Sequence, residues 1–338
     1  MTNYLKHAVR FVLAVLLYYS GVLAICHRMR RNVHKTGELI VLGLHRVLTA
    51  EEYAATGSDA SMVVMLPTFT CLLELLRKDF EVVSFAQVQR GETGIEGKPK
   101  CLLTFDDAWL DTFINVVPVL RDAGLTAMVF VPTALLGCQK NFWTESLTCI
   151  WRQGGEAQRA VRSAVLCAIH LETTTLSEVI AALKEMPLEK RDAVIDALCR
   201  KHPGVKPPVT DSFMSWEQLE QSAPQLEIGS HTIHHVLLDK EDDRVARHEL
   251  AESREELHRR TGLDVRALAY PNGNHNHLVR HWARKAGYKW AFTAHAGIFR
   301  ADGDRMRVPR MLIQESNLTN PWGRFSPAMT HLRLMGWR

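Results

Sequence analysis

The sequence predicts an α/β fold built on a parallel sheet or barrel. Three observations support this: continuous apolar runs, segments with helical spacing between them, and polar residues gathered where the apolar runs end. Strands that are buried on both faces are apolar throughout, and helices connect parallel strands. At 338 residues, the chain is long enough to bury a large core.

The predicted elements alternate regularly after a basic linker at residues 28–36. Apolar runs predict strands over residues 38–45, 80–85, 101–105, 126–132, 226–231 and 265–273, the last of which runs into a turn. Apolar residues at helical spacing predict helices over residues 66–79, 111–124 and 242–262. Glycines at 124 and 262 mark the C-terminal ends of two of these helices.

Residues 137–211 break the alternation. They are rich in Ala, Leu, Glu and Arg, have helical periodicity, and end in the Pro-rich connector KHPGVKPPVTD. Because the alternation resumes afterwards, we expect a helical insertion inside one domain at residues 37–320, followed by a tail at residues 321–338.

The N-terminal residues 1–36 contain an uncharged apolar run, Phe11 to Cys26, with basic residues on both sides. Its 16 residues fall a little short of the roughly 20 that cross a bilayer. We expect a single N-terminal helix that anchors the protein in the inner (plasma) membrane. Two basic residues precede the run and four follow it, which favours the cytoplasmic face and leaves the periplasmic side open.

The composition argues against some classes of partner and site. The net charge of +4 is mild, and no basic run is interleaved with aromatic residues, so we do not expect nucleic acid as a partner. Seven cysteines form no CxxC pair, which argues against a disulfide scaffold or a cysteine-ligated zinc ion.

Adjacent carboxylates end the predicted strand at residues 101–105, in the motif TFDD. Asp106 and Asp107 are costly to bury side by side unless a cation or hydrogen bonds stabilise them. One carboxylate could bind a metal ion while the other accepts a proton. From this dipeptide alone, a helix N-cap is the more common explanation.

The motif HTIHH places His231 and His235 four residues apart, so one tight turn could bring both rings to one cation. Two imidazoles and a carboxylate form a ligand set that leaves positions open for water and substrate. The pair alone is weakly specific. Thr232 excludes the HExxH motif of zinc proteases.

Two further strand ends carry polar groups. Tyr270 and Pro271 lie in AYPNG, which has the composition of a turn and whose backbone N–H could donate to an oxyanion. His45 ends the first predicted strand. On its own it would be an ordinary half-buried histidine, but if it faces the same cavity as Asp106 it becomes a candidate acid.

In their order and spacing, TFDDAW, HTIHH and AYPNG resemble the motifs of the polysaccharide deacetylases, carbohydrate esterase family four, over about residues 38–315. The arrangement is most similar to that of the exopolysaccharide poly-N-acetylglucosamine deacetylases. The resemblance implies a distorted (β/α) barrel of about seven strands. It also implies a metal-dependent hydrolase that removes acyl groups from an amino sugar in a polysaccharide or lipid-linked glycan.

The resemblance also implies roles for the motif residues. Asp107, His231 and His235 would bind Zn²⁺ or another divalent ion such as Co²⁺ or Ni²⁺. Asp106 would be the general base. The arginine that the family often carries just before the third motif is missing at Ala267 or Leu268, and we expect Arg310 to orient the base in its place through a charge-assisted hydrogen bond.

The remaining roles concern the leaving amine and the oxyanion. His45 would protonate the leaving amine, with His295 as the second candidate. The backbone N–H of Tyr270, in the motif that also holds Pro271, would stabilise the oxyanion.

One departure from the family pattern is Ala108, which stands where Gly is usual. Alanine should be tolerated there if its φ angle is negative. Two alternative functions stay open: a deformylase or amidase acting on a lipid-linked amino sugar, and a catalytically inactive carbohydrate-binding subunit.

Overall fold

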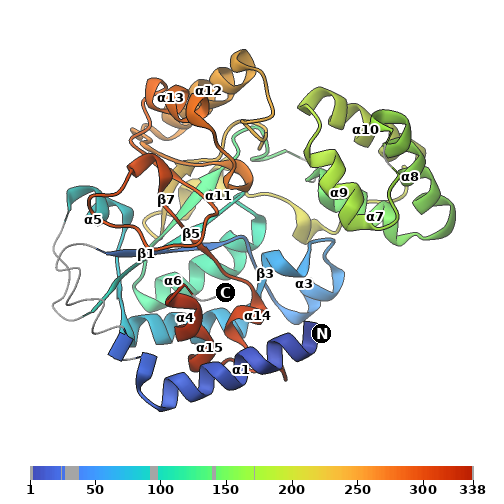
Figure 1. The fold of residues 1–338 in the computed structure, drawn as a ribbon. Helices are drawn as coiled ribbons and strands as arrows, with labels where there is room; N and C mark the ends of the chain where they lie inside the picture. The colour runs from blue at the N-terminus through green and yellow to red at the C-terminus, as the bar shows by residue number, and fades with distance from the viewer. Residues whose placement is uncertain are drawn as a thin grey trace.

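The computed structural model describes residues 3–23, 25–26, 38–91, 98–138, 142–170 and 172–336. Its main feature is one parallel sheet in the order β10-β1-β5-β6-β7-β8-β9, with the short β4 paired to the start of β5 (Figure 1). The strands are β1 (Leu39–Leu44), β4 (Glu81–Val82), β5 (Lys100–Phe105), β6 (Ala127–Val131), β7 (Leu226–Ser230), β8 (Ala267–Ala269), β9 (Trp290–Phe292) and β10 (Met311–Leu312).

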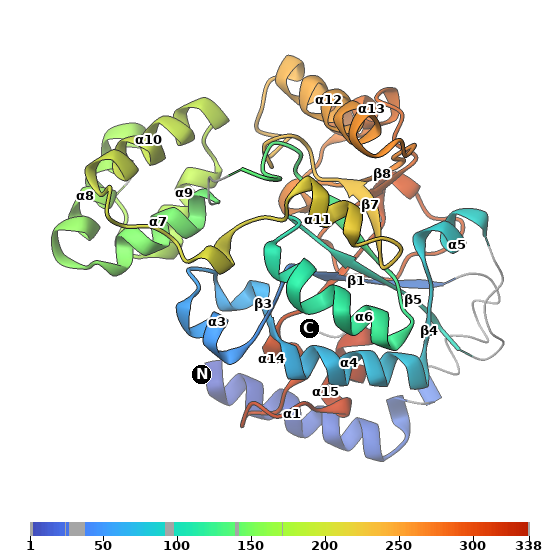
Figure 2. The same ribbon diagram turned by 180° about the vertical axis from the view of Figure 1, so that it is seen from behind.

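Helices surround the curled sheet, which forms the predicted (β/α) barrel in a distorted, half-open form (Figure 2). A separate two-stranded sheet pairs β2 (Arg46–Leu48) with β3 (Val63–Met65). The helices of this part are α3 (Ala50–Ala55), α4 (Leu66–Asp79), α5 (Phe85–Arg90), α6 (Val117–Ala123), α11 (Trp216–Gln221), α12 (Asp243–Thr261), α13 (His277–Lys285) and α14 (Glu315–Leu318).

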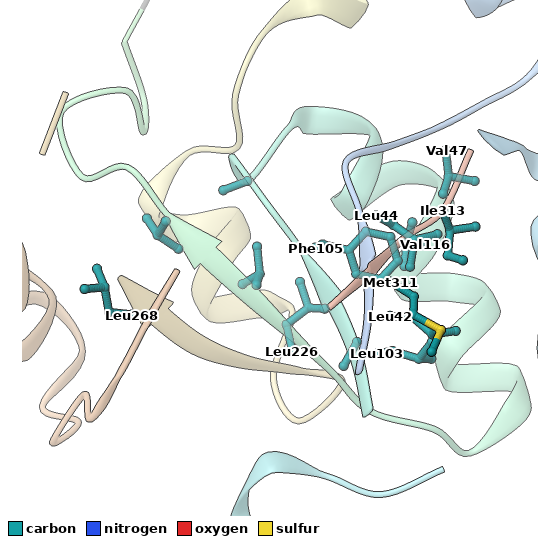
Figure 3. Close-up of a cluster of buried hydrophobic side chains, with 14 of the residues drawn as sticks. Leu42, Leu44, Val47, Leu103, Phe105, Val116, Leu226, Leu268, Met311 and Ile313 are labelled. Carbon is teal, nitrogen blue, oxygen red and sulfur yellow. The ribbon is translucent and has the colours of Figure 1, made fainter. Parts of the chain in front are cut away.

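Both faces of the sheet are buried, which explains why its strands lack an alternating polar pattern. Leu42 and Leu103 belong to the largest hydrophobic cluster, on the face shown in Figure 3. Their neighbours in sequence, Val41 and Leu102, belong to a second cluster on the opposite face. Successive side chains of a strand point to opposite faces, so a sheet covered on both sides requires apolar residues throughout.

Most predicted elements are confirmed, with one correction. The predicted helix at 66–79 is α4, and the predicted helix at 111–124 is a π-helical turn (Thr112–Val116) continued by α6, which ends at Gly124 with φ +66°. The strand predicted over residues 80–85 is wrong beyond β4. Ser84 caps α5 instead, in a capping box with Gln87, and this reciprocal pair of hydrogen bonds starts a helix.

The inserted segment forms a helical lobe beside the barrel (Figures 1 and 2). It consists of α7 (Trp143–Arg152), α8 (Gly155–Ile169), α9 (Leu176–Lys184) and α10 (Leu188–Lys201). The lobe has its own hydrophobic cluster, with Leu147, Val161 and Leu183 fully buried. We call this cluster, which also includes Trp109, Phe142, Trp143 and Phe213, the insertion core.

The prediction of a membrane anchor at residues 11–26 is wrong, and with it the inner-membrane localisation. Helix α1 (Asn3–Tyr19) ends inside the apolar run, where Gly21 has φ +78°. Within the described residues, no helix is both long and apolar enough to cross a membrane. One face of α1 instead packs on α15 (Pro327–Leu334), where Ala14 and Leu332 are buried in a shared cluster.

A buried arginine joins the barrel to the insertion. Arg46, in β2, is fully buried and forms ion pairs with Asp111 at 2.9 Å and with Asp211 at 2.5 Å. Its Nη1 also donates to Ser58, whose hydroxyl donates at 3.1 Å to Glu145 of α7. Because both carboxylates are buried with the guanidinium, the charges compensate one another in a region of low polarity.

Candidate metal centre

Two loops at the C-terminal edge of the sheet bring Asp107, His231 and His235 together. Asp107 follows β5, and the histidines follow β7. Asp107 Oδ1 lies 3.6 Å from Nε2 of His231 and 3.3 Å from Nε2 of His235, and the three atoms all lie within 4.8 Å of one another. Residues from distant parts of the sequence therefore converge on one point.

The donor set fits a divalent cation. In a tetrahedral site with bonds near 2.1 Å, ligand atoms stand roughly 3.3 to 3.5 Å apart, which is close to the two distances from Asp107. Asp107 Oδ1 is buried and has no hydrogen-bond partner, an arrangement that is costly for an anionic oxygen unless a cation stands beside it. A carboxylate with two imidazoles is a donor set typical of zinc and related ions.

The histidines are held in the neutral form that a metal ligand requires. Nδ1 of His231 lies 2.7 Å from the carbonyl oxygen of Ala269 at the end of β8, so Nδ1 carries the proton and Nε2 keeps its lone pair. Burial lowers the pKa of His231 to about 4 and that of His235 to about 3. Both rings are therefore uncharged near neutral pH.

Left-handed backbone conformations are concentrated at this site. Asp107, Ala108, Thr232 and His235 have φ angles of +71°, +55°, +69° and +55°. The condition under which we expected alanine to be tolerated at position 108, a negative φ, is therefore not met. A non-glycine residue in this region is strained, and such strain is typical of functional sites.

Asp106 is buried beside the candidate ligands and paired with Arg310. The guanidinium donates to both carboxylate oxygens, at 2.7 and 2.8 Å, and also to the carbonyl oxygen of Thr293. Burial alone would raise the pKa of Asp106, but the charge and the two hydrogen bonds of Arg310 outweigh it and hold that pKa well below its usual range. Asp106 is therefore an anion at every working pH.

The two candidate acids occupy different places. Nε2 of His45 lies 3.8 Å from Asp106 Oδ2, and its side chain is 22% exposed. His295 stacks on His275 with ring centroids 6.0 Å apart, and its backbone carbonyl accepts a hydrogen bond from the N–H of Arg310. The structure thus brings His45, at the end of β1, next to the carboxylates.

The expected oxyanion donor needs a correction. The backbone N–H of Tyr270 already donates to the carbonyl oxygen of Phe292 at 3.0 Å, because β8 and β9 continue their pairing to this point. Its hydroxyl donates to the carbonyl oxygen of Met306. Pro271 has no N–H. Tyr270 therefore supports the turn from the core and has no free backbone donor.

Sequence reasoning missed two aromatic residues that touch the candidate ligands. Nε1–H of Trp109 donates to Asp107 Oδ2 at 3.1 Å. The ring of Phe142 lies edge-on to His235, with centroids 5.0 Å apart. For Trp109 a signal was present, since it lies two residues after Asp107 in TFDDAW. Phe142 lies far from every motif, in the insertion, and carries no such signal.

Known protein structures share this fold. The deacetylase PplD from Streptococcus pyogenes, solved with acetate, is 18% identical with a TM-score of 0.56, over 86% of this chain and 100% of its own. IcaB from Ammonifex degensii is 19% identical with a TM-score of 0.56, over 90% and 99%. The BpsB deacetylase domain from Bordetella bronchiseptica is 19% identical with a TM-score of 0.52, over 82% and 96%. At such identities the likeness concerns the fold.

The family assignment comes from the sequence itself. No curated protein matches the chain significantly. The family described as polysaccharide deacetylase, in contrast, matches residues 93–291, which contain the carboxylate pair, both histidines and the AYPNG turn. This match covers more than half of the chain, and it agrees with the resemblance of the motifs. The chain belongs to the polysaccharide deacetylase family.

Proposed function

We propose that the protein is a metal-dependent N-deacetylase that hydrolyses the acetamide of an amino sugar in a polysaccharide. One observation carries the proposal: a carboxylate with an unpaired oxygen faces two neutral imidazoles, and a second carboxylate is held as an anion beside them. We further propose residues 37–320 as the catalytic domain, with the helical segment 137–211 inserted within it.

Asp107, His231 and His235 would hold the cation, either Zn²⁺ or an ion such as Co²⁺ or Ni²⁺. A divalent cation bound there supplies Lewis acidity toward a water molecule and toward the acyl carbonyl. Asp106 takes the proton from the attacking water. Asp106 is a weak base because Arg310 stabilises its charge. A weak base would suffice here, because a divalent cation at this site would lower the pKa of the attacking water.

The leaving amine needs a proton when its C–N bond breaks. His45 supplies it in this proposal, because its ring nitrogen lies 3.8 Å from Asp106 and is open enough to meet a substrate. The proton that Asp106 accepted can then pass to the imidazole of His45. Both residues thereby return to the protonation states in which they began the cycle.

The AYPNG turn supplies the oxyanion donor in this proposal, through the backbone N–H of Asn272. The amide of Tyr270 is used by Phe292, and that of Gly273 donates to the carbonyl oxygen of Tyr270 at 2.7 Å. Pro271 has no N–H, which leaves Asn272, with φ +57°, as the remaining donor of the turn.

The test compares turnover with metal binding. Protein loaded with Zn²⁺ should release amine from an N-acetylated chitooligosaccharide or from poly-N-acetylglucosamine, and metal-free protein should not. Asp106→Asn should lower turnover about 10²- to 10⁴-fold while it keeps the metal. The matched control is His234→Gln, since His234 is half exposed and its Nδ1 pairs with Glu249 at 2.7 Å rather than with Asp106 or Asp107.

Intact turnover in Asp106→Asn would show that this residue is not the base. Equal turnover of metal-free and loaded protein would exclude the metal-dependent reaction itself. Release of formate from a lipid-linked formamido sugar, with no release from the acetylated glycans, would favour the deformylase alternative. Glycan binding without any product would favour the inactive binding subunit.

A further inference from the structure

Trp109 connects the candidate metal centre to the helical insertion. The residue is fully buried, and its Nε1–H donates to Asp107 Oδ2 at 3.1 Å. Its ring belongs to the insertion core, where it stacks on Phe213 with centroids 4.8 Å apart and planes inclined by 26°. On another side, the Arg46 guanidinium lies 4.5 Å from the ring centroid. The indole is therefore fixed by protein contacts that do not depend on a bound metal ion.

The hydrogen bond from Trp109 makes the two oxygens of Asp107 unequal. Oδ2 is occupied by the indole N–H, whereas Oδ1 has no hydrogen bond and faces both imidazoles. Without this donor, a carboxylate can rotate about its terminal torsion, which is broad and roughly two-fold. With the donor in place, one oxygen alone is presented at the point where the histidine nitrogens meet.

The insertion core also reaches a second ligand. Phe142 immediately precedes α7, and its ring stands edge-on to His235 at a centroid distance of 5.0 Å and an angle of 79°. His231, in contrast, is held from the sheet by the carbonyl oxygen of Ala269. Of the three candidate ligands, one is thus positioned by the barrel and two contact aromatic residues of the insertion core.

We propose that Trp109 is a positioning residue: its N–H occupies Oδ2 of Asp107, so that Oδ1 alone is available to a metal ion. Contacts with the insertion core hold the indole in the orientation that this hydrogen bond requires. The inference rests on the proposed metal site and adds a function for the helical lobe: it builds one side of that site. Removal of a hydrogen-bond partner behind a metal ligand typically lowers metal affinity about 10- to 100-fold.

The test is metal affinity, measured by competition with a chromophoric chelator, together with the visible spectrum of the Co²⁺-loaded protein. Trp109→Phe keeps an aromatic ring in the core and removes the N–H. It should weaken Zn²⁺ binding about 10- to 100-fold and change the Co²⁺ spectrum. The matched control is Trp143→Phe, the same substitution in the same core, where the indole lies beside Arg191 and neighbours the site only through the ring of Phe142, with centroids 6.4 Å apart. It should change affinity by less than about threefold.

A second variant separates the hydrogen bond from packing. Benzothienylalanine at position 109 has nearly the shape of tryptophan but carries sulfur in place of the N–H, so it keeps the stack on Phe213. It should lose Zn²⁺ affinity as Trp109→Phe does. Wild-type affinity and an unchanged Co²⁺ spectrum in this variant would overturn the inference.

The outcomes also distinguish the inference from the proposed function. If the wild-type protein binds neither Zn²⁺ nor Co²⁺, the metal site itself is refuted. If the wild type binds the metal and both position-109 variants bind it equally well, the metal site stands and the role of Trp109 is refuted. If Trp143→Phe weakens binding as much as Trp109→Phe, general loosening of the insertion core explains the loss, and the hydrogen bond does not.

Discussion

Replacement of Glu145 by glutamine should change how the stability of the protein depends on pH. Glu145 lies in α7, is 1% exposed, and accepts hydrogen bonds from the hydroxyls of Thr144 and Ser58. Burial raises the pKa of Glu145 to about 7, because the hydroxyls and the nearby Arg46 offset only part of the desolvation of the charged form. Glutamine fills nearly the same volume and is neutral at every pH.

The sign and size of the effect follow from proton binding. Between the ordinary pKa of 4.5 and the folded value of about 7, the folded state holds a proton on Glu145 that the unfolded state has lost. The free energy of unfolding of the wild type therefore falls as pH rises through this range and levels off above it. At about 1.4 kcal/mol per unit, the loss amounts to roughly 3 kcal/mol.

The assay is urea denaturation of the metal-free protein at several pH values from about 4.5 to 8, the range over which the two states differ in bound protons. Relative to the wild type, Glu145→Gln should gain roughly 3 kcal/mol across this range. A control, Glu156→Gln, removes an exposed carboxylate from α8 of the same lobe and should follow the wild-type curve. If the difference in unfolding free energy between Glu145→Gln and the wild type were the same at all pH values, the raised pKa of Glu145 would be refuted.

Substitutions at two further positions test the charged and the strained parts of the site. Arg310→Met should destabilise the metal-free protein by about 3 to 5 kcal/mol in urea denaturation, because it leaves Asp106 buried without its partner. Arg310→Lys should lose less of the unfolding free energy, because lysine keeps the positive charge beside Asp106. Equal losses in the two variants would show that this charge does not stabilise the fold. Ala108→Gly should change the unfolding free energy by less than about 1 kcal/mol, since relief of the left-handed strain offsets the greater freedom of glycine in the unfolded chain. Ala108→Val should cost more than about 2 kcal/mol, and a neutral result by calorimetry would contradict the strain.

The sheet could be predicted from the sequence because its strands are buried on both faces. An apolar run such as residues 39–44 has few alternatives in an α/β chain, and the ends of parallel strands meet at one edge. This explains why Asp107 and His231 could be expected near each other from spacing and order. Local signals were less decisive where two local preferences of the sequence competed. At residues 80–85, a capping box outweighed β-propensity.

Other features depended on tertiary contacts that no local pattern contains. The apolar run at residues 11–26 has a composition close to that of a membrane span. Only the structure shows that one face of it packs on α15, while Val12, Leu13 and Leu16 stay exposed. The amide of Tyr270 is occupied because β9 happens to extend to Phe292. Contacts from the insertion, such as Phe142 against His235, join residues about 90 positions apart and could not be read from either segment alone.

The packing of α1 on α15 has a consequence for biosynthesis. The surface that covers α1 is made more than 300 residues later, and β1 likewise receives its neighbour β10 only near the end. A ribosome that adds roughly 5 to 20 residues per second needs roughly 15 to 60 s to travel that far. During this interval the face of α1 that later packs on α15 is uncovered, and transiently exposed apolar surface of this kind is what chaperones shield.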